Sequence, residues 1–93
     1  MDDAKHAAGE PGIPALYMTS WCNFCGLVVS AAERLGRDIE LRDIETNADW
    51  RQELAAATGR ETVPCLRIEA SPGELVWMHE SRDIIRYLEA NPR

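Results

Sequence analysis

The pair Cys22-Asn23-Phe24-Cys25 constrains the fold more than any other feature of this sequence, because it joins an apolar run to an amphipathic segment. The run at residues 15–18 is typical of a buried strand. After the pair, apolar residues recur at steps of three and four. This pattern predicts a helix with an inward face made of Phe24, Leu27, Val28, Ala31, Ala32 and Leu35. A strand, a turn and a helix therefore meet at Cys22.

The position of Cys22 has a chemical consequence. A sulfur at the start of a helix lies near unpaired backbone N–H groups and the positive end of the helix macrodipole. Both favour the thiolate, which is the nucleophilic form of cysteine. We therefore expect Cys22 to be the nucleophile. Cys25 lies about one turn further into the helix, at the spacing needed to close a disulfide with Cys22, and it is expected to stay an enclosed thiol until Cys22 has reacted.

Length and composition limit the classes of function. The chain has 93 residues, of which 45% are hydrophobic, and this is enough for one small domain and its core. A net charge of −6 without a basic stretch argues against nucleic-acid binding. No apolar run approaches the ~18 residues of a membrane span. The acidic start of the chain lacks the pattern of a secretory signal, so we expect a cytoplasmic protein without membrane contacts.

Periodicity and turn residues predict the order of the elements. Residues 1–12 carry no periodicity and are expected to form a flexible tail ahead of a domain at 13–93. Strands are predicted at 13–18, 38–44, 62–68 and 75–78, with helices after the first, second and fourth of them and a turn at 71–73 after the third. The first helix is expected to be capped by Thr19 or Ser20 and to end at Gly36. Residues 46–49 offer caps for the second helix, which is expected to end at Gly59. The third helix is predicted over residues 81–89.

The second predicted helix places Trp50, Leu54 and Ala57 on one face, which we interpret as packing residues. The full order is β-α-β-α-β-β-α. A right-handed strand–helix–strand crossover followed by a hairpin and a helix predicts an α/β fold, with a four-stranded mixed sheet flanked by three helices.

Three motifs occur in this order: Cys22-x-x-Cys25 after the first strand, Thr62-Val63-Pro64 before the third, and a closing helix after a hairpin. With these motifs, the sequence resembles a glutaredoxin over residues 14–91. The resemblance implies a thioredoxin-like fold and an enzyme that uses glutathione to reduce protein disulfides and glutathione mixed disulfides. Cys22 and Cys25 would be catalytic and glutathione the co-substrate. No metal is expected. The expected partners are disulfide-bonded or glutathionylated proteins, and the protein itself is expected to be a monomer.

The resemblance also implies a glutathione site. A cis bond before Pro64 would expose the backbone of Val63 to the cysteinyl part of glutathione, as an added strand. Glu80-Ser81 matches the pair that binds the γ-glutamyl end in glutathione-transferase amino-terminal domains. Arg51 stands where glutaredoxins contact the glycine carboxylate, to which a guanidinium donates two parallel hydrogen bonds. Phe24 completes the predicted glutathione-binding residues.

The sequence departs from the glutaredoxin pattern in three places. Thr19 replaces a lysine that often stands three residues before the first cysteine. Asn23-Phe24 replaces the Pro-Tyr between the cysteines, and Met78-His79 replaces a glycine pair. His79 is interpreted as a partly exposed packing residue, with tuning of Cys22 as the alternative. Cys65 is interpreted as a small buried hydrophobe, with a redox role as the alternative.

Two other functions remain open. Cys-x-x-Cys is also a metal-ligand spacing, so Cys22 and Cys25 could bind zinc or an iron–sulfur cluster with further ligands. The sequence holds no second such pair, which a structural zinc site would need. A non-catalytic glutathione-binding module is the other alternative, and the paired cysteines argue against it.

Overall fold

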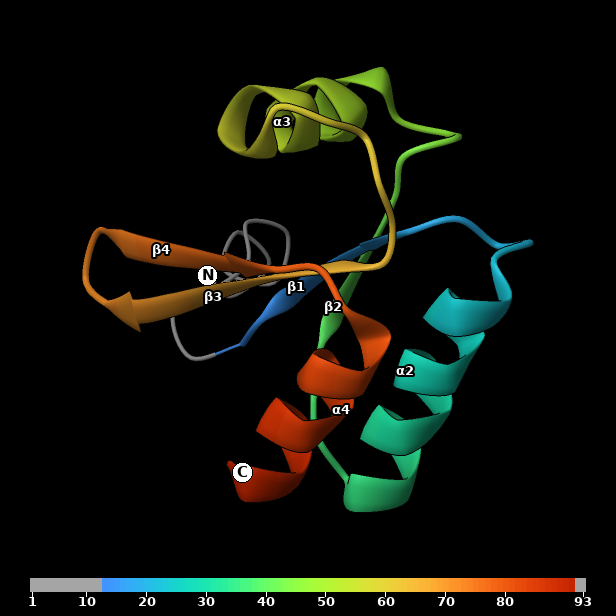
Figure 1. Cartoon of the computed structure of the whole chain (residues 1–93), viewed down its shortest axis with the longest axis vertical. Helices are drawn as coiled ribbons and strands as arrows, with labels where there is room; N and C mark the ends of the chain where they lie inside the picture. Colours follow the sequence, from blue (N-terminus) through green and yellow to red (C-terminus); the bar gives the residue numbers. More distant parts are fainter. Residues whose placement is uncertain (1–12, 92–93) are drawn as a thin grey trace, which may run out of the picture.

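A computed structural model describes residues 13–91 of the chain. Seven elements, four strands and three helices, follow one another in the predicted order β-α-β-α-β-β-α. Their bounds are β1 Ala15–Met18, α2 Asn23–Leu35, β2 Glu40–Asp43, α3 Ala48–Thr58, β3 Cys65–Ser71, β4 Glu74–Met78 and α4 Ser81–Ala90 (Figure 1). None of the helices within 13–91 combines the length and apolar character that crossing a bilayer requires.

The strands form one mixed sheet in the order β2-β1-β3-β4. β1 and β2 are parallel and joined through α2, whereas β3 is antiparallel to both β1 and β4. The pairing of Tyr17 with Cys65 fixes the register between β1 and β3. Because β3 begins at Cys65, the residue before it, Pro64, lies beside the end of β1, where the chain turns toward the cysteine pair.

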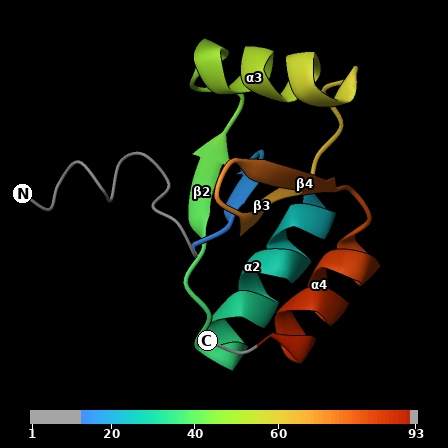
Figure 2. The same ribbon diagram turned by 90° about the vertical axis from the view of Figure 1, so that its left-hand side faces the viewer.

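Helices cover both faces of the sheet. α2 and α4 lie side by side on one face, and α3 lies on the other (Figures 1 and 2). The larger core cluster lies on the side of α2 and α4 and consists of Leu16, Val28, Ala32, Leu66, Ile68, Ile84 and Leu88. The smaller cluster lies under α3 and consists of Ala15, Tyr17, Ile44, Leu54 and Cys65, with Trp50, Val63 and Trp77 packed against it. Each face of the sheet therefore has its own apolar core.

The ends of the helices follow the predicted chemistry with one exception. Gly36 ends α2 and Gly59 ends α3, both in the left-handed conformation at φ 66° and 81°. Asn47 caps α3 by accepting hydrogen bonds from the backbone N–H groups of Asp49 and Trp50. The exception is α2, which neither Thr19 nor Ser20 caps. Cys22 itself is the capping residue, so its sulfur occupies the place that a hydroxyl oxygen usually takes.

The strand boundaries differ from the predicted ones by one to three residues. β1 and β2 are shorter than predicted, and β3 starts at Cys65 rather than at residue 62. The segment before β3 lies outside the strand and carries a cis peptide bond between Val63 and Pro64. β4 begins one residue earlier and α4 ends one residue later than predicted.

The alternation in β2 places an unexpected residue inside. Arg42 is only 4% exposed, whereas Leu41 is 45% exposed. The Arg42 guanidinium lies under α3, where it donates to the Tyr17 hydroxyl at 2.8 Å and to a Glu53 carboxylate oxygen at 3.0 Å, and it pairs with Glu40 at 3.1 Å. The two terminal nitrogens of Arg42 have partners in β1, α3 and β2 itself, whereas its buried Nε has no hydrogen-bond partner among the described residues.

The predicted inward face of α2 is also wrong at its first turn. Phe24 is 60% exposed and Leu27 is 55% exposed, whereas Val28, Ala31 and Ala32 are buried as predicted. Ala57 of α3 is likewise exposed, although Leu54 is buried and Trp50 is half-buried as expected. Cys25 of the same turn is 1% exposed, so the first turn of α2 faces the core with Cys25 rather than with Phe24.

Candidate active site

Cys22 lies at the start of α2, with its backbone in an extended conformation at φ −88° and ψ 118°. Its sulfur accepts a hydrogen bond from the backbone N–H of Cys25 at 3.2 Å. The Cys22 side chain is partly exposed. The Cys25 N–H places a hydrogen-bond donor against the Cys22 sulfur at the helix start, and the partial exposure leaves this sulfur accessible to an incoming disulfide.

Cys25 lies directly behind Cys22 and is buried, at 1% exposure. Burial, together with a hydrogen bond to the Cys22 sulfur, raises the pKa of Cys25 to about 12. The backbone of Thr19 donates to Cys25 and opposes this rise only in part. The two cysteines are both free thiols and differ in the way predicted for an attacking and a resolving sulfur.

Cys65 has the structural character predicted for it. It is fully buried in the cluster under α3, and this burial raises its pKa to about 11. Its side chain therefore stays a protonated thiol among apolar neighbours.

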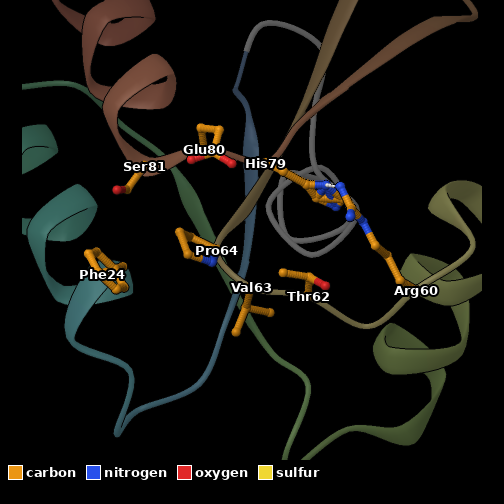
Figure 3. Close-up of a pocket in the computed structure, with 8 residues that line it drawn as sticks. All are labelled: Phe24, Arg60, Thr62, Val63, Pro64, His79, Glu80 and Ser81. Carbon is orange, nitrogen blue, oxygen red and sulfur yellow. Dashed lines mark hydrogen bonds between the residues drawn. The ribbon is translucent and has the colours of Figure 1, made fainter.

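A shallow cavity of about 220 Å³ lies beside the first turn of α2. The peptide bond between Val63 and Pro64 is cis, and both residues line the cavity. Figure 3 shows Phe24 and Ser81 on one side of Pro64, and Thr62 and Arg60 on the other. Phe24, two residues after Cys22, lines the cavity, whereas Cys22 and Cys25 do not. The full set of lining residues is Phe24, Arg60, Thr62, Val63, Pro64, His79, Glu80 and Ser81.

The start of α4 forms one side of the cavity. Glu80 is the capping residue of α4, but its side chain makes no capping hydrogen bond, and Ser81 is the first helical residue. The Ser81 hydroxyl therefore does not serve as an ordinary helix cap. No Glu80 side-chain oxygen therefore caps the first N–H groups of α4 at the cavity rim.

Arg60 and His79 form the opposite end of the cavity. Arg60 comes from the loop between α3 and β3, and His79 from the segment between β4 and α4. A terminal nitrogen of Arg60 lies 3.4 Å from Nδ1 of His79. Partial burial and the nearby Arg60 charge lower the pKa of His79 below its usual value, while Glu80 opposes this shift.

The predicted glutathione-binding residues are therefore brought together with one exception. Val63, Pro64, Glu80, Ser81 and Phe24 all line one cavity. Arg51 does not; it is exposed on α3. Sequence reasoning did not identify Arg60 and Thr62 as site residues, although both stand within four positions of Pro64. The run Arg60-Glu61-Thr62-Val63-Pro64 was the available signal, because a cis-proline loop places its neighbours at the same surface.

Comparison with known proteins decides the family. Residues 15–71 match the family model described as Glutaredoxin. This segment holds the Cys22–Cys25 pair and the Thr62-Val63-Pro64 loop. The chain belongs to the glutaredoxin family. The match ends before α4, so Glu80 and Ser81 lie outside the matched segment. Membership supports a thiol–disulfide oxidoreductase role for Cys22 and Cys25 in general terms.

A search of solved structures confirms the thioredoxin-like fold of this family member. The thioredoxin-like protein BC3987, solved in a mutant form, superposes with a TM-score of 0.67 at 19% sequence identity. The similarity covers 86% of this chain and 99% of that chain. A search of curated proteins finds no match. Within residues 13–91, no group of three or more His, Cys, Asp or Glu side chains is arranged to hold a metal ion.

Proposed function

We propose that this glutaredoxin-family protein is a glutathione-dependent oxidoreductase that reduces glutathione mixed disulfides and protein disulfides. The observation that carries the proposal is the 3.2 Å hydrogen bond from the Cys25 backbone N–H to the Cys22 sulfur, at the start of α2 and beside a cis-proline cavity. It supports the partly exposed Cys22 sulfur as the attacking group. The buried Cys25 thiol would then resolve the mixed disulfide that Cys22 forms.

The cavity has complementary groups for an extended glutathione molecule. The backbone of Val63 would pair with the cysteinyl unit, which directs the glutathione sulfur toward Cys22. The N–H groups at the start of α4 would bind the γ-glutamyl carboxylate, and the Glu80 carboxylate its ammonium group. The glycine carboxylate would then reach the opposite end, where Arg60 is the cationic residue that lines the cavity. We assign to Arg60 the role that the resemblance gave to Arg51.

The reaction follows from thiol–disulfide exchange. The Cys22 thiolate attacks the glutathione sulfur of a mixed disulfide, and the original S–S bond breaks. The released target thiolate takes a proton from solvent, and Cys22 is left bonded to glutathione. The thiolate of a second glutathione attacks this bond, which returns Cys22 to its starting state and releases glutathione disulfide.

Protein disulfides would take a second route through Cys25. After Cys22 has formed a mixed disulfide with the target, Cys25 loses its proton and attacks the Cys22 sulfur. The target thiol leaves, and a bond between Cys22 and Cys25 remains for two glutathione molecules to reduce. The raised pKa of Cys25, about 12, keeps this thiol unreactive until its neighbour is engaged.

The two routes give an asymmetric test. Cys22→Ser should abolish reduction of a small glutathione mixed disulfide, measured by coupling to glutathione reductase and following NADPH. Cys25→Ser should retain that activity and lose most reduction of a protein disulfide. Equal loss in both variants would contradict the single-cysteine route.

The electron donor is tested separately. The wild-type protein should accept electrons from glutathione with its reductase. Reduction by thioredoxin reductase without glutathione, at a comparable rate, would contradict the glutathione dependence.

A further inference from the structure

Arg60 is a long, exposed side chain at the end of the cavity, and its guanidinium has one side-chain contact. Among residues 13–91 it makes no ion pair with a carboxylate, and its terminal nitrogen instead lies 3.4 Å from Nδ1 of His79. Figure 3 shows the Arg60 side chain reaching across to the His79 ring. The Arg60 guanidinium therefore contacts an uncharged nitrogen rather than a carboxylate. Its positive charge stays available to a ligand.

This contact depends on the tautomer of His79. A guanidinium can only donate hydrogen bonds, so the contact is a hydrogen bond in the tautomer whose Nδ1 accepts and whose ring proton is on Nε2. Nε2 is buried and has no hydrogen-bond partner among the described residues. A buried N–H without a partner is unfavourable for stability. The same arrangement presents Nδ1 to the Arg60 guanidinium.

We propose that His79 is a positioning residue that holds the Arg60 guanidinium in place for the glycine carboxylate of glutathione. This inference rests on the glutathione-dependent function proposed above and adds a residue from outside the segment that matches the glutaredoxin family model. Without the Nδ1 acceptor, Arg60 is free to rotate into solvent, and carboxylate binding must restrain it again at an entropic cost.

The proposal has a pH consequence. Arg60, from the loop after α3, and Glu80, at the start of α4, are the charged groups that act on His79. Protonation removes the Nδ1 lone pair and places a second cation against Arg60, which drives the guanidinium away. We therefore expect carboxylate binding to weaken as the pH falls below the ordinary histidine range, near ~6.5.

The test measures binding without chemistry. Cys22→Ser protein is titrated with S-methylglutathione, a thioether that cannot exchange, by isothermal titration calorimetry at pH 7.5. His79→Leu should weaken binding about three- to tenfold, a change of about 0.7 to 1.4 kcal/mol. His79→Asn should bind within about twofold of the parent, because its side-chain oxygen lies near the position of Nδ1 and can accept from Arg60.

Two controls separate positioning from a purely structural role. In an Arg60→Ala background, His79→Leu should cause no further loss of affinity, since the group it positions is absent. With the glycine ethyl ester of S-methylglutathione, His79→Leu should bind as the parent does. A loss that persists in either control would overturn the proposal, as would equal affinity of the parent and His79→Leu proteins.

The pH arm gives an independent readout. Between pH 7.5 and 5.5 the parent should lose affinity while His79→Asn stays nearly constant, because the ligand carboxylates titrate well below this range. Tighter binding of the parent at low pH would mean that the protonated ring binds the carboxylate itself, and would overturn the positioning role. Failure of the parent to bind S-methylglutathione at all would instead overturn the proposed function, and this inference with it.

Discussion

Arg51 and Arg60 carry the same charge nine positions apart, yet only Arg60 lines the cavity. We predict that Arg60→Ala weakens binding of S-methylglutathione about tenfold or more, because it removes a charge-assisted hydrogen bond to a carboxylate. Arg51→Ala is the matched control and should bind as the parent does. Calorimetric titration of both variants measures this, and a loss in Arg51→Ala alone would return the role to Arg51.

Phe24 and Val28 lie on the same helix, but we expect substitution of Phe24 to affect substrate binding and substitution of Val28 to affect stability. Phe24 is 60% exposed and lines the cavity, whereas Val28 is fully buried. Phe24→Ala should change the free energy of unfolding by no more than about 0.5 kcal/mol and raise the KM for a glutathione mixed disulfide. Val28→Ala should cost about 1 to 3 kcal/mol of stability. Urea unfolding combined with steady-state kinetics measures both, and a large stability loss in Phe24→Ala would show that its ring packs in the core.

At the scale of the element, two glycines of α2 predict opposite effects of one substitution. Gly36 ends the helix at φ 66°, where an alanine side chain is strained, although no atom within 4 Å would clash with it. Gly26 lies inside the helix in equally open space and without a positive φ. Gly36→Ala should therefore lower the free energy of unfolding by about 1 kcal/mol, and Gly26→Ala should raise it by about 0.5 to 1 kcal/mol. Chemical denaturation checks the pair, and effects of the same sign would contradict the argument.

The sequence predicts the bounds of α3 but not the polar contacts that join α3 to the sheet. Its capping residue Asn47, its stop at Gly59 and its buried Leu54 follow from local sequence. Its polar attachment does not, because Glu53 meets Arg42 of β2 and the Tyr17 hydroxyl of β1, the latter at 2.6 Å. The alternation in β2 indicated a half-buried strand, but only the neighbours supplied by α3 and β1 explain how a charge is satisfied on its inner face.

At the scale of the whole molecule, three buried acids make the fold sensitive to high pH. Burial is the largest cause that raises the pKa of Cys25 from 9.0 to about 12, of Cys65 from 9.0 to about 11, and of Tyr17 from 10.0 to about 12. In the unfolded chain these groups release their protons first, so their contribution to stability is complete below pH 9 and declines above it.

We therefore predict that the free energy of unfolding falls between pH 9 and 11, with each titrating group contributing a slope of up to about 1.4 kcal/mol per pH unit. Urea unfolding at a series of pH values measures the decline. Tyr17→Phe removes one of the three groups and should flatten the decline above pH 10. A constant free energy of unfolding over this range would contradict the assigned burial.

The sequence by itself determined the order and type of all seven elements, the two glycine helix ends and the position of Cys22 at the start of α2, because periodicity, turn residues and helix termini are local properties. It also indicated most residues of the cavity through motifs with known spacing.

Only the tertiary structure decided which side chains meet. The sheet register brings Pro64 beside the end of β1. The first turn of α2 buries Cys25 and leaves Phe24 exposed, and Arg60 meets His79 across nineteen positions. Contacts of this kind depend on how separate elements pack, and no local pattern records them.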